Sequence, residues 1–248
     1  MSERTSVNAA SRWNALDADV TACRRCPRLV EHRETMARVK RAAFADETYW
    51  GKPVPGLGDR RARLLIVGLA PAAHGANRTG RMFTGDRSGD WLFRALHEAG
   101  FANQSASNSV DDGLELTDCF ITAAARCAPP ANKPTPGERD NCRPFLEREL
   151  DLLGGDDRLR VIVVLGQFAY DHTLRVLRDR RFRAPVPKPK FGHGRHVSVI
   201  RDDPIAAAGP SSLTLITSYH PSQQNTFTGK LTRPMLADVF AAARRELG

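Results

Sequence analysis

The sequence predicts one α/β domain of three layers, in which helices cover both faces of a central, mostly parallel sheet. The chain of 248 residues is long enough for one substantial core and short for two, so we expect a single domain over residues 1–248. Its hydrophobic content of 41% is an ordinary globular value. Short apolar runs alternate with segments of helical periodicity, as in parallel strands joined by crossover helices.

Strands are predicted where the chain is apolar for a few residues at a time. They are Leu64–Leu69, Thr117–Ala125, Val161–Leu165 and Leu213–Ser218, with a weaker candidate at His196–Arg201. Apolar residues at helical spacing predict the helices between and after them. These are 27–43, Ser88–Ala99, a helix that opens at the capping box Thr135–Glu138, Phe168–Leu177 and Thr232–Leu247. Two breaks, Asn103–Gly113 and Arg201–Ser212, are predicted to be surface insertions.

The charge of the chain favours a polyanionic partner. The net charge is +9 with a pI near 9.8, which suits nucleic acid above all, although a basic bias also arises from lineage composition. Ligands of open α/β sheets bind beyond the carboxyl ends of the strands. The loops expected there, Pro71–Gly85 and Tyr219–Ala237 among them, contain basic residues and no acid. This pattern predicts a negatively charged ligand at that edge, with chance as the alternative.

The N-terminus has no apolar segment of the kind that directs secretion, and no run approaches the ~18 apolar residues of a membrane span. We therefore expect a cytoplasmic protein that does not enter a membrane. In that reducing setting the five cysteines are expected to be thiols or metal ligands rather than disulfides.

Four of the cysteines have the pattern of a metal site. Cys23 and Cys26 form a C-x2-C pair, and Cys127 and Cys142 stand about a hundred residues later. Thiolate sulfur suits zinc or an iron–sulfur cluster, and the wide second spacing favours iron–sulfur over a zinc ribbon. The alternative is that they are buried small residues. Cys119 is expected to be a core thiol, and the segment 1–45 to be anchored by the metal site.

The loop after the last strand, "SYHPSQQNTFTGKLT", is rich in neutral polar residues. His220 directly follows the strand, where it is a candidate hydrogen-bond donor to a developing anion or, alternatively, an ordinary structural histidine. Amides and hydroxyls bond to phosphates and base edges without adding negative charge, and an aromatic ring can wedge into a base stack. The candidate DNA contacts are Ser222, Gln223, Gln224, Asn225, Thr226, Phe227 and Lys230.

The loop after the first strand, "GLAPAAHGANRTGRMFTGD", is rich in glycine and has no acid, cysteine or serine before Asp86. Its glycines lack the spacing of a dinucleotide or P-loop fingerprint. Phe83 is either a core residue or the stacking wall of a base pocket, with Arg78 and Arg81 beside it as candidate phosphate contacts.

These segments together resemble the uracil-DNA glycosylase superfamily, and most closely its iron–sulfur-containing family 5 (type B) enzymes. The resemblance covers nearly the whole chain: "CRRCP", "YWGKPVPGLGD", "GLAPAAHGANRTGRMFTGD", "RCAPPANKPTP", "VVLGQFAY" and "SYHPSQQNTFTGKLT" occur in order. It implies an α/β/α fold with a parallel four-stranded sheet and a [4Fe–4S] cluster on Cys23, Cys26, Cys127 and Cys142. It also implies a monomeric, monofunctional DNA N-glycosylase, a hydrolase that removes deaminated bases and leaves abasic sites.

The substrates implied are uracil and, more broadly, hypoxanthine, xanthine and etheno-cytosine, in double-stranded and also single-stranded DNA. Related families carry Asp, Asn or Glu just before the loop proline, where this chain has Ala70. The resemblance therefore implies catalysis by leaving-group stabilisation, with His220 bonding the base carbonyl. Asn132 is the candidate for the base edge or the water, and Asn77 and Asp86 are lesser candidates for the water. Asp86 is equally a helix cap.

Gly68, Ala70 and Phe83 are expected to line the base pocket, with the flipped base between Phe83 and His220. The residues from Gln223 to Phe227 would fill the gap left in the helix. Two other functions remain open at this point. One is a non-catalytic iron–sulfur redox sensor that binds DNA, and the other is a zinc-stabilised RNA-binding module.

Overall fold

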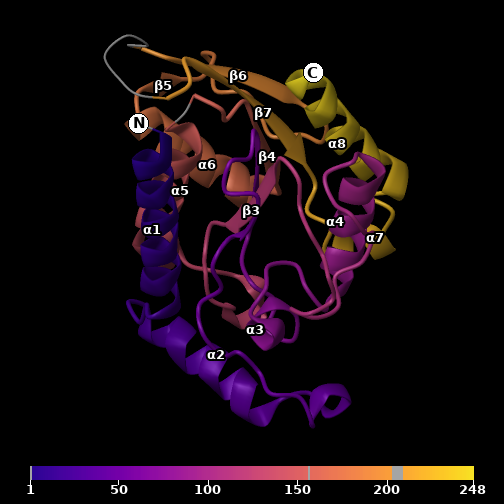
Figure 1. Cartoon of the computed structure of the whole chain (residues 1–248). Helices are drawn as coiled ribbons and strands as arrows, with labels where there is room; N and C mark the ends of the chain where they lie inside the picture. The colour runs from indigo at the N-terminus through magenta and orange to yellow at the C-terminus, as the bar shows by residue number, and fades with distance from the viewer. Residues whose placement is uncertain (1, 156, 203–208) are drawn as a thin grey trace.

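A computed structural model of the chain describes residues 2–155, 157–202 and 209–248, and side chains from Ala9 onward. One seven-stranded sheet runs through the molecule in the order β1-β3-β2-β4-β7-β6-β5 (Figure 1). The strands are β1 (Leu57–Gly58), β2 (Leu64–Gly68), β3 (Cys119–Ala123), β4 (Val161–Leu165), β5 (Phe182–Arg183), β6 (His196–Arg201) and β7 (Ser212–Ser218).

The four predicted strands form the parallel centre of this sheet. β2 pairs with β3 and with β4, and β4 pairs with β7, all in parallel. The predicted four-stranded parallel sheet is thus confirmed as the centre. The whole sheet is wider than expected, because antiparallel strands extend both of its edges. β1 is added beside β3, and β6 and β5 beside β7. The weaker candidate, His196–Arg201, is β6, whose alternating burial is that of a strand with one face in solvent.

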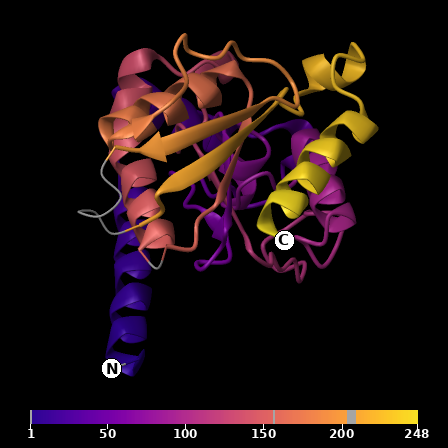
Figure 2. The same cartoon turned by 90° about the horizontal axis from the view of Figure 1, so that it is seen from above.

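Helices cover both faces of the sheet, which confirms the three layers (Figure 2). One face is packed by α4 (Arg87–Glu98) and α8 (Arg233–Leu247). The other is packed by α1 (Ser2–Thr21), α5 (Pro136–Gly154) and α6 (Gln167–Asp179). Alternate residues of β2 divide between the faces: Leu64 and Ile66 point to the first, and Leu65 and Val67 to the second. This two-residue period buries both faces of the central strands.

The N-terminal part is more helical than the sequence predicted. α1 packs beside α5 through Trp13, Leu16 and Val20, so apolar contacts anchor this part in addition to any metal site. The helix expected over 27–43 is α2 (Pro27–Val39), which ends where Lys40 turns to a φ of +56°. The segment between α2 and β1 includes the short helix η1 (Ala42–Phe44).

The predicted capping box is present: Thr135 accepts from the Glu138 backbone, and the Glu138 side chain accepts from the Thr135 backbone. The remaining short helices are α3 (Ala76–Thr79), η2 (Pro130–Asn132) and α7 (Gln223–Phe227). Asn103–Gly113 lies largely at the surface as predicted, whereas 203–208 of the other predicted insertion lie outside the described residues. Within the described part of the chain, no helix is long and apolar enough to cross a membrane.

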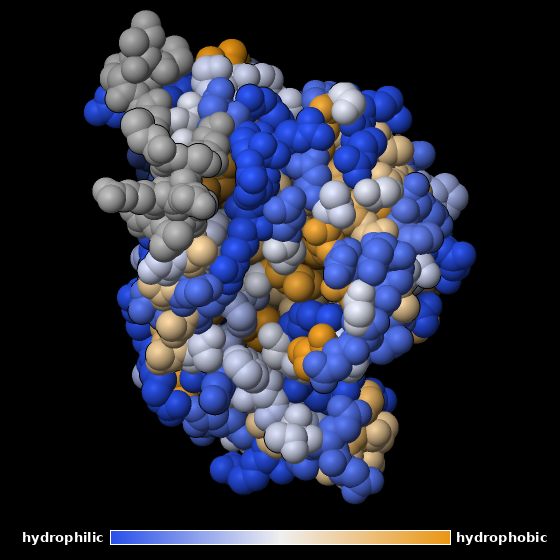
Figure 3. All heavy atoms as spheres, in the orientation of Figure 1, coloured by the Kyte–Doolittle hydropathy of each residue, from blue (hydrophilic) through white to orange (hydrophobic). Residues whose placement is uncertain are grey.

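Because the four central strands are parallel, their carboxyl ends lie at one edge of the sheet. The glycine-rich loop leaves β2 there, the Cys127 loop leaves β3, and the His220 loop leaves β7. On the face shown in Figure 3, apolar atoms gather in a hollow between the side of α1 and α5 and the side of α4 and α7, framed by hydrophilic residues.

Candidate functional site

The loops after β2 and β7 bring Phe83 and His220 together. Their rings are stacked, with centroids 6.0 Å apart and planes inclined by 28°. A base inserted between two ring planes needs roughly 7 Å, twice the stacking rise. The expectation that a base lies sandwiched between the two rings therefore does not fit this arrangement. A base can stack on Phe83 and meet His220 at its edge, or it must separate the rings.

The backbone around Phe83 explains how its ring is presented. Phe83 has a φ of +54°, a left-handed conformation that is strained for a bulky residue. Two glycines make room for it. A Cβ on Gly68 would lie 2.9 Å from Phe83 Cζ, and a Cβ on Gly89 would lie 1.7 Å from the Phe83 carbonyl oxygen. Gly68, predicted as a pocket residue, is thus the floor beneath the Phe83 ring.

His220 is a neutral imidazole at physiological pH. It is half-buried, and desolvation lowers its pKa to about 4. Among the described residues no side chain is hydrogen-bonded to its ring, while its carbonyl accepts from Asn225 Nδ2 at 2.9 Å. Asn225 therefore fixes the backbone of His220, and the two ring nitrogens are left to a ligand, one as a donor and the other as an acceptor.

Asp86 is the N-cap of α4. Its Oδ1 accepts from the Gly89 backbone at 3.0 Å, and a Cβ on Gly75 would collide with its Oδ2. Burial raises the pKa of Asp86. The capping interpretation is confirmed, and nothing in these contacts adds a role with water. Ala70 is half-buried and offers no polar group to a water molecule.

Asn77 and Asn132 lie in very different surroundings. Asn77 is fully buried, and its Nδ2 donates to the carbonyl of Arg33 at 3.2 Å, which turns it toward α2. We therefore revise its expected role from water activation to structure. Asn132 is exposed at the end of η2, and it and Ala131 both have left-handed φ angles, of +55° and +52°. It remains a candidate for the base edge or the water.

Arg78 and Arg81 require a correction. Both are buried, with 8% and 9% of their surface exposed. Arg78 forms an ion pair with Glu47 and donates to the Gly85 carbonyl at 3.0 Å. Arg81 pairs with Asp112 at 2.6 Å. They hold the loop together rather than face DNA phosphates, because acids from other segments neutralise them.

The loop after β7 separates into supporting and exposed residues. Ser222 caps α7 by accepting from the Asn225 backbone, and Thr226 bonds the carbonyl of Gln223. The exposed members, which are free to meet a partner, are Gln223, Gln224, Phe227 and Lys230. The guanidinium of Arg87 lies 4.2 Å from the centre of the Phe227 ring. The sequence did not single out Arg87, since the residue after a helix cap carries no signal of a contact with a distant loop.

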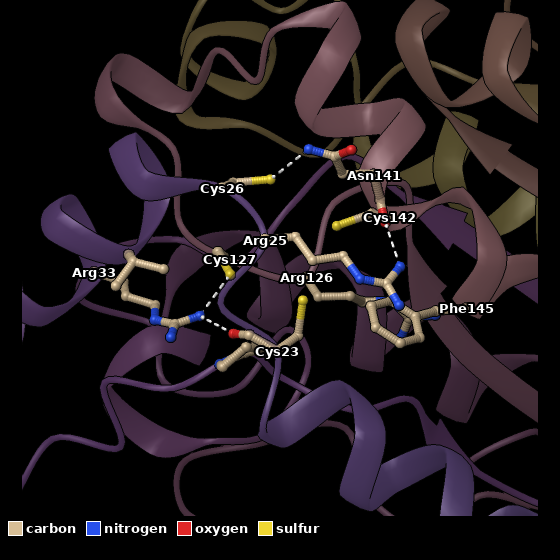
Figure 4. Close-up of a pocket in the computed structure, with 11 residues that line it drawn as sticks. Cys23, Arg25, Cys26, Arg33, Arg126, Cys127, Asn141, Cys142 and Phe145 are labelled. Carbon is tan, nitrogen blue, oxygen red and sulfur yellow. Dashed lines mark hydrogen bonds between the residues drawn. The ribbon is translucent and has the colours of Figure 1, made fainter.

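The four predicted cysteines line one pocket. Cys23 and Cys26 come from the segment joining α1 and α2, Cys127 from the loop after β3, and Cys142 from α5. Their sulfur atoms turn toward the same space in Figure 4. Within the described residues, however, no three His, Cys, Asp or Glu side chains form a group ready to hold a metal ion. Cys119 is fully buried in β3, as expected of a core thiol.

Two buried guanidiniums border this pocket. Arg33 Nη1 donates to Cys127 Sγ at 3.0 Å, and Arg126 Nη2 donates to Glu149 at 2.5 Å. The Nε of Arg33 and the Nε and Nη1 of Arg126 have no partner among the described residues. Unpaired buried donors are costly, so they indicate an acceptor in the pocket. Thiols around a cavity with unpaired cationic donors beside them fit an anionic thiolate-bound group.

In the absence of such a group the thiols of Cys127 and Cys142 are protonated. Burial raises the pKa of Cys127 to about 11, and that of Cys142 to about 12. A metal would have to displace these protons, which makes its uptake dependent on pH.

Comparisons with known proteins single out one family. The family model described as "Uracil DNA glycosylase superfamily" matches residues 55–244. A type-5 uracil-DNA glycosylase of Mycobacterium tuberculosis is 52% identical over 233 residues, which are 94% of this chain and 81% of the relative. One of Thermus thermophilus is 47% identical over 229 residues, 92% of this chain and 95% of the relative. One of Pyrobaculum aerophilum is 43% identical over 226 residues, 91% and 89%.

Proposed function

Because this chain belongs to the uracil-DNA glycosylase superfamily and resembles its type-5 members over nearly its whole length, we propose that it excises uracil from DNA. The reaction is hydrolysis of the N-glycosidic bond. The bond electrons leave with the base, the water oxygen bonds to the sugar carbon, a proton released by that water ends on the departing base, and an abasic site remains. The observation that best supports this proposal within the molecule is the pairing of Phe83 with a neutral His220.

His220 would act on the leaving group. As the bond breaks, negative charge builds on the base carbonyls, and a neutral N–H donor in a half-buried site stabilises it. A depressed pKa suits this task, because the imidazole gives a hydrogen bond without adding a full charge to the pocket. The loop from Ala70 to Gly85 supplies no carboxylate to serve as a strong base. The chemistry then rests on the departing base, and Asn132 is the candidate to orient the base or the water.

Phe83 would stack on the extruded base, and exposed Phe227 would occupy the space that the base leaves in duplex DNA. This arrangement also motivates a wider range of bases. A pocket wall of aromatic ring, glycine and alanine selects mainly by shape, so we propose hypoxanthine, xanthine and etheno-cytosine as further substrates. Double-stranded DNA would be the usual partner and single-stranded DNA a second one.

The experiment is release of free base from oligonucleotides that carry each lesion, with thymine as the control base. The proposal expects uracil release and alkali-labile abasic sites in single- and double-stranded DNA. Tight binding without any abasic product would instead favour the redox-sensor hypothesis, which gains no support from the relatives described above, all of them named glycosylases.

We also propose that Cys23, Cys26, Cys127 and Cys142 hold a [4Fe–4S] cluster. The support is the convergence of four thiols on one pocket and the unpaired donors of Arg33 and Arg126. Bound there, the cluster would join three distant segments through iron–thiolate bonds and leave the base chemistry to the side chains named above.

Substitution tests the cluster directly. Cys142→Ser is expected to lose most of the iron and the broad visible absorption, whereas Cys119→Ser, at a buried thiol outside the pocket, is expected to keep both. Iron content and absorption are measured on freshly purified protein. Equal iron in the two variants, or zinc in the wild type, would contradict the assignment.

A further inference from the structure

We propose that Asn77 is a positioning residue that ties the base-pocket loop, defined as residues 70–85, to the cysteine pocket through Arg33. An occupied cysteine pocket would then order the loop that carries Phe83. This inference deepens the proposed function and rests on it, but its test includes a measurement that needs no activity.

The first half of the connection is made by Arg33 of α2. Its side chain is 2% exposed, and Nη1 donates to Cys127 Sγ at 3.0 Å and to the Cys23 carbonyl at 3.2 Å. The carbonyl of the same residue accepts from Asn77 Nδ2 at 3.2 Å. Arg33 therefore contacts two pocket cysteines with its side chain and the base-pocket loop with its backbone.

The second half is made by α3, the short helix inside the loop. Beside its bond to Arg33, Asn77 donates to the Ala73 carbonyl at 3.4 Å, and its own carbonyl accepts from the Gly51 backbone at 3.0 Å. The next residue, Arg78, donates to the carbonyls of His74, at 2.9 Å, and Gly85, at 3.0 Å. Asn77 thus joins α2 and Gly51 to the first part of the loop, and its neighbour Arg78 extends the connection to Gly85 at the loop's end.

The loop needs such bracing. Phe83, Gly80 and Gly85 all have left-handed φ angles, and strained residues persist only where the surroundings fix them. The Asn77 Oδ1 is buried and has no partner among the described residues, so the amide is held through its donor nitrogen. The connection therefore depends on the Nδ2 donor of Asn77, and a substitution that removes this donor breaks it.

The position of the residue separates this role from a catalytic one. Asn77 is fully buried, and its amide nitrogen is committed to carbonyls of α2 and of its own loop. An effect of Asn77 on the reaction would therefore pass through the placement of Phe83 rather than through contact with a substrate.

The experiment compares iron-loaded wild type with Asn77→Leu, which keeps the size of the side chain and removes the donor. We expect Asn77→Leu to keep the iron content and visible spectrum. Amide hydrogen exchange in peptides covering 72–85 should rise about tenfold relative to α8, the ratio that corresponds to one buried hydrogen bond. The single-turnover rate of uracil release should fall by a similar factor, with little change in KM.

Asn141→Leu is the matched control. Its Nδ2 lies 3.3 Å from Cys26 Sγ, on the α5 side of the pocket, so it disturbs the cysteines without touching the loop. At equal iron content it should leave exchange at 72–85 unchanged. Wild type stripped of iron supplies a second measurement, because the connection predicts faster exchange at 72–85 when the pocket is emptied.

Several results would overturn the inference: unchanged exchange at 72–85 in both Asn77→Leu and stripped protein, an equal effect of Asn141→Leu, or a chain that binds no iron. If Asn77→Leu does not fold, Asn77→Ser is judged by the same exchange and rate. Exchange that follows iron in a protein without uracil release would leave the connection standing and refute the proposed function.

Discussion

The arginines on the two sides of the base-pocket loop differ in how completely their donors are paired within the protein. Toward the base pocket, Arg78 and Arg81 form ion pairs with Glu47 and Asp112, which neutralise their charge within the protein. Toward the cysteine pocket, Arg126 has a buried partner in Glu149 yet keeps two nitrogens unpaired. A buried basic residue therefore indicates an anionic ligand only where some of its donors are left without protein acceptors.

The same contrast appears in what shapes each region. The base pocket depends on backbone conformation and on a neutral histidine, whereas the cysteine pocket depends on side chains brought together from three distant segments. Substitutions that leave the net charge unchanged should therefore lower the rate of uracil release most when they alter the base pocket.

The largest effect there is expected from His220→Ala. Removing the neutral donor should slow single-turnover uracil release about 100-fold, the scale of losing one preorganised donor. His97→Ala, at an exposed position late in α4, is the control and should retain wild-type activity. Because burial lowers the pKa of His220 to about 4, its titration should cause no loss of rate between pH 8 and 6. A loss below threefold in His220→Ala would contradict the role of this imidazole as a donor to the leaving base.

Gly68→Ala tests the floor of the pocket. The new Cβ would lie 2.9 Å from Phe83 Cζ, so the ring must move, and the rate should fall roughly 30-fold as the stacking wall is misplaced. Gly137→Ala is the matched change, since a Cβ there would meet no described atom within 4 Å apart from its chain neighbours and the backbone of its own helix. Single-turnover rates of the two variants are compared, with circular dichroism to check folding. Equal rates would show that Phe83 has no place in the reaction.

Phe227→Ala tests whether this ring fills the space that the extruded base leaves in the duplex, a role separate from the base pocket. Phe227 is 67% exposed, so its loss should spare the fold. We expect about tenfold slower release from duplex DNA and little change on single strands, because only a duplex leaves a stack to be filled. Ile200→Ala, at a position that is 59% exposed on β6, should change neither rate. An equal loss on both substrates would assign Phe227 to general DNA affinity.

The smallest expected effect is on the free energy of unfolding, through a buried histidine of α6, on the same face of the sheet as α5. His172 in α6 is 1% exposed, neither ring nitrogen has a partner among the described residues, and burial lowers its pKa to about 4. Below pH 6.5 the unfolded chain takes up a proton that the native ring cannot, so stability falls with pH down to about 4. From pH 7.5 to 5.5 this amounts to about 1 kcal/mol of unfolding free energy.

His172→Leu should remove that component, which is measured as the change in urea-unfolding free energy between the two pH values. His97→Leu again serves as the exposed control. A variant whose stability falls as steeply as that of the wild type would show that the native histidine is protonated in this range.

Local patterns predicted much of the fold. The central strands and the long helices were found because burial leaves apolar runs and helical periodicity in the sequence, as in Val161–Leu165 of β4. Trp13, Leu16 and Val20 carried a helical signal for α1 that the polar N-terminus obscured. The two-residue strands β1 and β5 are too short to leave any pattern.

The fold class, the family and the four cysteines that share a pocket could all be predicted from the sequence, because residue types and the order of motifs along the chain carry that information. Three further findings required the folded arrangement: Arg78 and Arg81 support the loop, Asn77 faces α2, and Arg87 lies over Phe227. Each of those roles depends on a partner from a different segment. The energy of a charge or an amide is set by its neighbours in space, which the order of residues along the chain does not give.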